Sequence, residues 1–165
     1  MVKGKWAVTV LVIAAGLLAA FSLFPGEEKN VKRQFSLLAH YASKEEGEKI
    51  LAMARKMKNL ESLFAESCEV TAPPYSLAGN FSRADLANLP ARARLNFSHL
   101  ALTFHDLSVS FPDRETAQVV LTGEVRGKSS RGAQIHEVRE VACLLKKHEG
   151  EWLFSRWEVV EVLKR

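Results

Sequence analysis

The feature that most constrains this 165-residue chain is a run of nineteen residues without a charge, from Trp6 to Phe24. As a helix, such a run covers about 28 Å, close to the hydrocarbon thickness of a bilayer. A helix in the core of a small soluble protein is seldom apolar on every side over that length. The run is therefore predicted to be an uncleaved membrane anchor; a cleaved signal peptide and a buried core helix are the alternatives.

The residues around the run predict its orientation. Lys3 and Lys5 precede it, and basic residues remain on the cytoplasmic side, so the rest of the chain is expected to cross the membrane. The bulky side chains of Phe21 and Phe24 follow the alanines, which makes a poor signal-cleavage site. The expected organisation is a basic segment 1–5, an anchor 6–24 in contact with the lipid bilayer, a linker 25–30 and one folded domain 31–165.

Composition and charge are those of an ordinary globular protein. Hydrophobic residues make up 47% and charged residues 25% of the chain. The net charge of +4 results from 23 basic and 19 acidic residues, which is too balanced to predict binding to nucleic acid.

The cysteines and histidines form no metal-binding pattern. Cys68 and Cys143 are far apart in sequence, and none of the five histidines has the spacing of an H-E-x-x-H motif. No metal or cofactor is therefore expected. In an oxidising compartment the two cysteines could form a disulfide, and two separate buried thiols are the alternative.

Helical periodicity dominates the first half of the domain. Residues 27–42 predict an amphipathic helix with Val31, Phe35, Leu38 and Tyr41 on one face. Ser43 and Glu46 have the spacing of a capping box and predict a second helix over 44–66. Its expected core stripe is Ile50, Ala54, Met57, Leu60 and Phe64.

A short strand and a third helix are predicted next. The strand covers 68–72 and ends at Pro73-Pro74, and a loop is expected over 75–80. Ser82 and Asp85 form a second capping box, and the helix that begins there should kink or divide at Pro90.

Four strands follow, joined by short turn-forming segments, and short turns predict an antiparallel meander. The expected strands are 100–111, 116–127, 133–147 and 151–163. In the first of them, the apolar residues Leu102 and Phe104 have even numbers, whereas Leu107 and Val109 have odd numbers. In a regular strand these two pairs would therefore lie on opposite faces. One extra residue restores the face, so a bulge is predicted near His105-Asp106, and the bent sheet is expected to curl around the helices.

This order of elements resembles the nuclear transport factor 2-like fold, including the SnoaL-like group. Two segments strengthen the resemblance: LESLFAESCEVTAP (60–73), and REVACLLKKHEGEWLFSRWEVVEV (139–162), where Lys147, Gly150 and Trp152 mark the closing hairpin. The resemblance covers about 31–163 and extends to small bacterial envelope proteins that carry one amino-terminal anchor. It implies an α+β cone, with helices packed on a strongly curved antiparallel sheet and an opening between them.

Proteins of this fold include isomerases, cyclases and dehydratases as well as non-catalytic modules, so the fold does not decide function. Asp85, Asp106 and Asp113 match no catalytic motif of the group. Tyr75 and Trp152 are aromatic residues that could line a pocket or pack in the core. The candidate pocket residues are Tyr41, Phe64, Phe104, His105 and Trp157.

The expected function is that of a periplasmic binding or assembly module, anchored in a bacterial inner membrane, that takes a partner protein or a small apolar ligand. An isomerase or dehydratase acting on a hydrophobic small molecule is the alternative, and secretion after cleavage is the alternative location. The charged segment 136–140 predicts an exposed sheet face with cross-strand ion pairs to Glu124, Arg126, Arg156 or Glu158. A homodimer through this outer sheet face is the second interpretation.

Overall fold

The computed structural model describes residues 25–160. Its elements in chain order are α2 (Pro25–Ala42), α3 (Ile50–Glu61), β1 (Phe64–Ala72), the 3-10 turn η1 (Pro73–Tyr75), β2 (Leu77–Ser82), α4 (Arg83–Leu95), β3 (Phe97–Ser110), β4 (Thr116–Ser129), β5 (Gln134–His148) and β6 (Glu151–Val160). The predicted anchor, Trp6 to Phe24, lies outside the described residues. Within residues 25–160, no helix is both long and apolar enough to cross a membrane.

The segment 25–30, which we expected to be a linker, forms the first turns of α2. Pro25 suits the first position of a helix because its missing N–H has no partner there in any case. Glu27 and Glu28 place negative charge in the first turn, where the helix dipole favours it. The compact domain begins at Val31.

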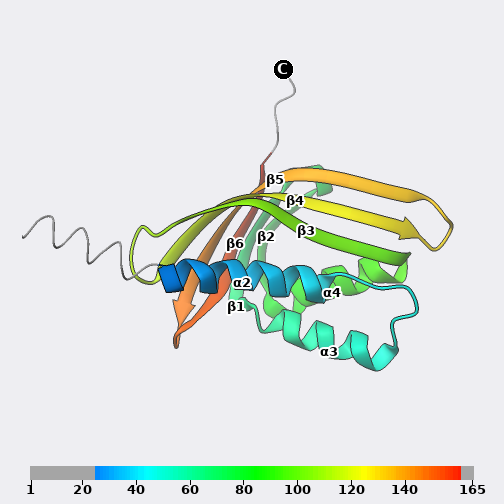
Figure 1. Ribbon diagram of the computed structural model, residues 1–165, viewed down its shortest axis with the longest axis horizontal. Helices are drawn as coiled ribbons and strands as arrows, with labels where there is room; N and C mark the ends of the chain where they lie inside the picture. The colour runs from blue at the N-terminus through cyan, green and yellow to red at the C-terminus, as the bar shows by residue number, and fades with distance from the viewer. Residues whose placement is uncertain (1–24, 161–165) are drawn as a thin grey trace, which may run out of the picture. The chain divides into compact units, whose positions relative to one another are not determined.

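The strands form one six-stranded sheet in the order β2-β1-β6-β5-β4-β3. All neighbours are antiparallel except β1 and β6, which run parallel. The long strands β3, β4 and β5 curve over the helices, which lie on the concave side of the sheet (Figure 1). The architecture is therefore the predicted α+β arrangement of helices on a curved sheet, and the meander of β3 to β6 is confirmed.

Aromatic side chains hold α2 against the inner face, the sheet face that the helices cover. Phe35 of α2 is 1% exposed. Its ring meets Phe104 and Phe154 edge to face, with centroids 5.5 and 5.0 Å apart, and it lies 6.3 Å from the ring of Trp157. Pairs in this geometry stabilise beyond the area that they bury. The predicted inward face of this helix is confirmed by the burial of Val31, Phe35 and Leu38.

The second helix is shorter than predicted. It begins at Ile50, and the chain from Phe64 onwards already belongs to β1. The capping box at Ser43 does not form, because the Ser43 hydroxyl donates to the carbonyl of Ala39 (2.7 Å) and accepts from the amide of Leu102 (2.9 Å). Of the predicted core stripe, Leu60 and Phe64 are buried, whereas Ile50 is 82% exposed.

The segment between β1 and α4 also differs from the prediction in part. Residues 77–82, mostly expected to be a loop, form β2, which pairs with β1 from Ser67 to Ala72. The cap at Ser82 is confirmed, since its hydroxyl accepts from the amide of Asp85 at 3.2 Å. Pro90 lies inside α4 without dividing it, because the helix continues to Leu95.

The bulge in β3 is confirmed. Pairing with β4 shifts register between His105 and Ser108, and Asp106 takes a left-handed backbone conformation with φ 55°. The extra residue keeps Phe104 and Leu107 on the inner face, where both pack against the core. The bulge therefore curves the strand without exposing its apolar side chains.

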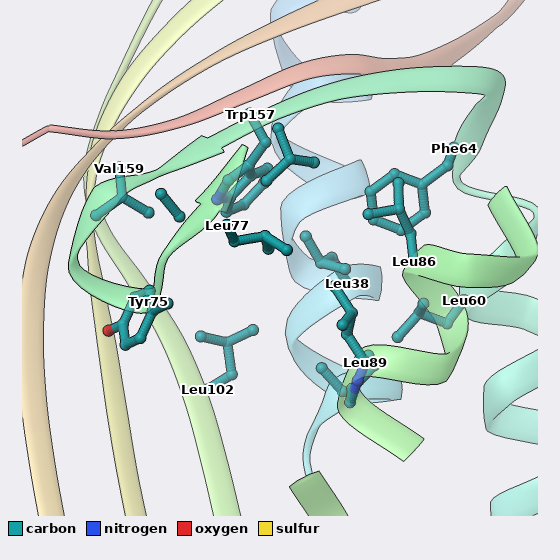
Figure 2. Close-up of a pocket in the computed structure, with 14 residues that line it drawn as sticks. Leu38, Leu60, Phe64, Tyr75, Leu77, Leu86, Leu89, Leu102, Trp157 and Val159 are labelled. Atoms are coloured by element: carbon teal, nitrogen blue, oxygen red, sulfur yellow. The ribbon is translucent and has the colours of Figure 1, made fainter. Parts of the chain in front are cut away.

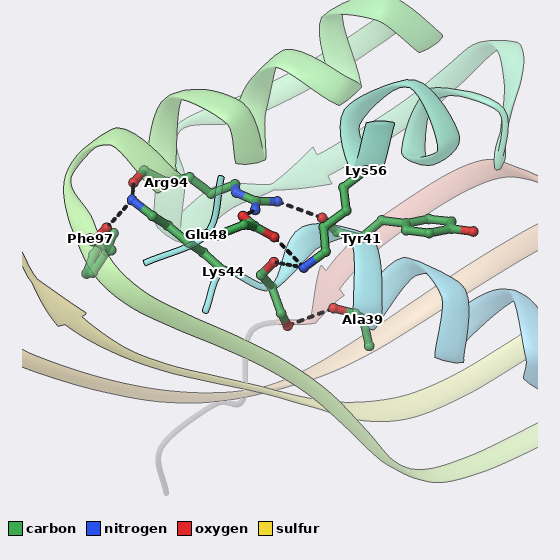
Figure 3. Close-up of polar contacts among 8 residues, drawn as sticks. Ala39, Tyr41, Lys44, Glu48, Lys56, Arg94 and Phe97 are labelled. Carbon is green, nitrogen blue, oxygen red and sulfur yellow. Dashed lines mark hydrogen bonds and ion pairs between the residues drawn. The ribbon is translucent and has the colours of Figure 1, made fainter. Parts of the chain in front are cut away.

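A buried polar cluster joins the helices to the sheet (Figure 3). Arg94 of α4 is fully buried; its guanidinium donates to Glu48 and to the carbonyl of Tyr41, the latter at 2.8 Å. Lys44 donates to the carbonyls of Arg94 (2.9 Å) and Phe97 (2.7 Å). These contacts fix the connection between α2 and α3 against α4 and the start of β3.

Candidate functional site

An apolar pocket of about 280 Å³ lies between the inner face of the sheet and the helices (Figure 2). Helices α2, α3 and α4 contribute leucines, among them Leu38, Leu60 and Leu86. The strands contribute Leu77, Leu102 and Val159. Each of these side chains faces inward because of the helical or alternating periodicity of its own element. The pocket is therefore lined by the same apolar residues that the sequence pattern directs toward the core.

Tyr75 and Leu89 mark the opening of the pocket to solvent. Among the lining residues these two are large and exposed, with 52% and 39% of their surface accessible to solvent. Tyr75 ends the turn η1, where Pro73 and Pro74 restrict the backbone, and Leu89 lies in α4. The pocket therefore meets solvent at η1 and α4.

The walls carry almost no polar groups. The polar side-chain atoms of the lining residues are the hydroxyl of Tyr75 and the indole nitrogen of Trp157. Tyr75 is thus the one titratable side chain among the residues that line this pocket. Such walls favour the binding of apolar molecules over charged ones, because burying a charge without a partner costs roughly several kcal/mol of free energy.

Tyr75 connects the pocket to a charged pair on β5. Its hydroxyl donates to a carboxylate oxygen of Glu137, and the ring lies at the edge of the pocket with its oxygen directed toward the sheet (Figure 2). Burial raises the pKa of the Tyr75 phenol above its ordinary value of 10.0, and the hydrogen bond to Glu137 raises it further. The phenol therefore stays protonated and acts as a donor at neutral pH.

The five predicted pocket residues lie in four different places. Phe64 and Trp157 line the pocket. Phe104 packs in the core beside Phe35 and Trp157, with ring centroids 5.5 and 6.0 Å away. Tyr41 lines a separate, more polar recess beside α2.

His105 lies on the outer face of the sheet and not in the pocket, because it follows the inward-facing Phe104 in regular strand alternation before the bulge begins. There the Nε2 atoms of His105 and His136 lie 3.0 and 2.7 Å from the carboxylate of Glu124. The hydrogen bond from Arg126 is the first cause that lowers the pKa of Glu124 to about 2, and the two histidines follow. The pair between His136 and Glu124 is one of the predicted cross-strand pairs. Within residues 25–160, no group of three or more histidine, cysteine, aspartate or glutamate side chains is arranged to hold a metal ion.

Cys68 and Cys143 are free, buried thiols, so the disulfide considered above is not formed. Cys68 is on β1 and Cys143 on β5, and β6 lies between these strands. Two strand spacings separate the backbones by about 10 Å, which is too far for a disulfide. Burial raises the pKa of the Cys68 thiol to about 11.

Sequence reasoning missed the pairing of Tyr75 with Glu137. The two residues are 62 positions apart, and the contact requires η1 to be brought over β5. Alternation in β5 does place Glu137 on the same face as the buried Val141, and this was the available signal. An acidic residue on the apolar face of a strand is expected to have a hydrogen-bonding or ionic partner.

No protein-family model matches the sequence, and no curated protein matches it. Solved structures do match its fold. A candidate scytalone dehydratase from Novosphingobium aromaticivorans is 16% identical over 83% of this chain and 85% of its own, with a TM-score of 0.68. A type 2 hexachlorocyclohexane dehydrochlorinase (LinA) is 13% identical, with coverage of 82% and 84% and a TM-score of 0.64.

A candidate dehydratase of the nuclear transport factor 2-like family from Streptomyces avermitilis is 14% identical over 82% of this chain and 97% of its own, with a TM-score of 0.62. At these identities the similarity shows the fold alone. The domain has the nuclear transport factor 2-like fold, as the sequence resemblance implied.

Proposed function

We propose that this nuclear transport factor 2-like domain binds a small, largely apolar molecule in the pocket between its helices and sheet. The observation that carries the proposal is the pocket itself, which combines a volume of about 280 Å³ with apolar walls. A cavity of about 150 Å³ accommodates benzene, so this pocket has room for a molecule of about two rings. Burial of the ligand's apolar surface would supply the binding free energy.

Equilibrium dialysis of the full-length protein with biphenyl tests the proposal. Wild type should bind one equivalent, and Ala72→Phe should weaken binding by about tenfold or more, because a phenyl ring then occupies space inside the pocket. Ala78→Phe is the matched control, since Ala78 is exposed on the adjacent strand β2 opposite Thr71. Absence of saturable binding in wild type, or equal binding by the two variants, would refute the proposal.

Enzymatic elimination is the second candidate, and the names of the similar structures favour it over a purely non-catalytic role. They include dehydratases and a dehydrochlorinase. Elimination needs a group that removes a proton near the substrate. Among the described residues that line the pocket, Tyr75 is the titratable one, and its protonated phenol donates a hydrogen bond to Glu137, so the carboxylate and not the phenol is the available proton acceptor.

Measuring chloride release from hexachlorocyclohexane, which is one example of an elimination reaction, distinguishes the binding function from the enzymatic one. If the domain only binds, release in the presence of the purified full-length protein should equal that in buffer. Sustained release that is lost in Tyr75→Phe would establish the enzymatic candidate, because that substitution retains the ring but removes the hydroxyl.

The location and assembly of the protein remain separate proposals. We propose that Trp6 to Phe24 anchors the domain to a membrane and that the outer sheet face pairs two copies. Recovery of the full-length chain in a carbonate-washed membrane fraction would support the anchor, and recovery in the soluble fraction would refute it. Sedimentation of the full-length protein should give a dimer, and a monomer at micromolar concentration would refute pairing.

A further inference from the structure

Glu137 lies beside the pocket although it is not one of the lining residues. Leu102 of β3 lines the pocket and pairs with Val125 of β4, which in turn pairs with Glu137 of β5. These three residues form one row across the inner face. Leu102 and Glu137 are therefore two strand spacings apart, about 10 Å across the sheet, and Tyr75 both lines the pocket and contacts Glu137.

The carboxylate of Glu137 retains capacity to accept hydrogen bonds. A carboxylate offers about four acceptor positions, and the Tyr75 hydroxyl occupies one of them on Oε2. The other oxygen, Oε1, is 3.9 Å from the guanidinium of Arg139, which is longer than a hydrogen bond. The side chains of Glu137 and Arg139 are 42% and 40% exposed, so a ligand at the pocket opening can reach them.

The charges at this point favour a neutral donor group. Arg139 compensates the charge of Glu137, so the site has no net charge with which to attract a cation. The adjacent walls are apolar and would penalise a charged ligand. A hydroxyl satisfies both conditions, since it donates to a carboxylate and carries no charge.

We propose that Glu137 is a specificity-determining residue that selects apolar ligands ending in a neutral hydroxyl, with Tyr75 holding the carboxylate toward the pocket opening. This inference rests on the proposed binding function and names the ligand class for the same site. The apolar body lies against Leu102 and Trp157, and the hydroxyl passes Val125 to donate to Glu137. Small-molecule sites commonly combine apolar walls with a few polar groups that orient the ligand.

Two ligands of nearly equal shape test the inference: 4-hydroxybiphenyl and 4-methylbiphenyl. Equilibrium dialysis with the full-length protein gives the ratio of their dissociation constants, which isolates the contribution of the hydroxyl. In Glu137→Leu this ratio should shift against 4-hydroxybiphenyl by about tenfold, while binding of 4-methylbiphenyl stays within about twofold of wild type. Unchanged methylbiphenyl binding also shows that the variant is folded.

Glu140→Leu is the matched control, because Glu140 lies on the same strand with its side chain on the outer face. It should leave the ratio unchanged. If both ligands bind wild type and Glu137→Leu leaves the ratio unchanged, or Glu140→Leu shifts it equally, the inference is wrong and pocket binding stands. If neither ligand binds wild type, the binding function fails and this inference fails with it.

Discussion

Arg94 and Glu48 form an ion pair inside the domain, with the arginine side chain fully buried and the glutamate side chain 7% exposed. The second carboxylate oxygen of Glu48 lies 2.6 Å from the ammonium of Lys56. One acidic residue from the segment between α2 and α3 thus pairs with cations from two helices, α3 and α4. Removing Glu48 would leave the fully buried guanidinium of Arg94 without its counter-ion in a site that water reaches poorly.

We expect Arg94→Met to lower the free energy of unfolding by about 1–3 kcal/mol, because the Glu48 carboxylate then keeps only Lys56 as a partner and the carbonyl of Tyr41 loses its donor. Chemical denaturation measures the change. Arg92→Met is the control, since Arg92 is exposed on the same helix and should have an effect below about 0.5 kcal/mol. Equal effects of the two substitutions would show that burial of the pair does not contribute to stability.

The backbone at Asp106 predicts an unusual response to substitution. Its φ of 55° is in the left-handed region, which glycine adopts freely and β-branched residues resist. Asp106→Gly should retain or increase stability, and Asp106→Val should reduce it by about 1–2 kcal/mol. Thr103→Val, at an ordinary position of the same strand, should be nearly neutral in the same denaturation assay. A stable Asp106→Val variant would mean that the bulge is absent.

Glu124 predicts a pH dependence of stability. Its pKa is lowered from 4.5 to about 2 in the folded protein, so the unfolded chain binds the proton more readily. The stabilisation should be complete above pH 4.5 and disappear as the pH falls through about 2. The melting temperatures of wild type and Glu124→Gln should therefore differ at pH 7 and converge at low pH.

Glu140→Gln is the comparison for this measurement, because it also removes an acidic group from the outer face of the sheet. At pH 7 the melting temperature of Glu140→Gln should differ less from that of wild type than the melting temperature of Glu124→Gln does. A constant difference between wild type and Glu124→Gln from pH 7 to pH 2 would contradict the assigned pKa.

The two cysteines should be unreactive while the domain is folded. Both thiols are buried, and desolvation raises both pKa values, that of Cys68 to about 11, so little thiolate forms at pH 8. A thiol-reactive aromatic disulfide reagent should label neither cysteine in native protein and both in guanidinium chloride. Failure to label the unfolded chain without reductant would reveal a disulfide instead of free thiols.

Local patterns in the sequence were sufficient for most of the secondary structure. The alternation of apolar residues predicted β3 to β6, and the change of phase between Phe104 and Leu107 predicted the bulge. The cap at Ser82 was also predicted, because donor and acceptor are three residues apart. In each of these cases the interacting groups are close in sequence, so their spacing already contains the information.

The start of α3 shows why other elements could not be predicted. Ser43 and Glu46 have the spacing of a capping box, but the Ser43 hydroxyl bonds to Leu102, 59 residues away. The parallel pairing of β1 with β6 and the formation of β2 likewise depend on partners from distant parts of the chain. A long-range partner competes with a local one, and sequence spacing alone does not show which is stronger.

The sequence by itself determined that this chain forms a curved sheet with helices on one side, because burying a regular apolar pattern has few solutions. Only the tertiary structure decided where the pocket lies, which of the predicted aromatic residues reach it, and that Tyr75 meets Glu137 at its opening. A cavity is the volume that side chains from many elements leave unfilled. Its position and polarity therefore depend on their joint packing and not on the pattern of any one segment.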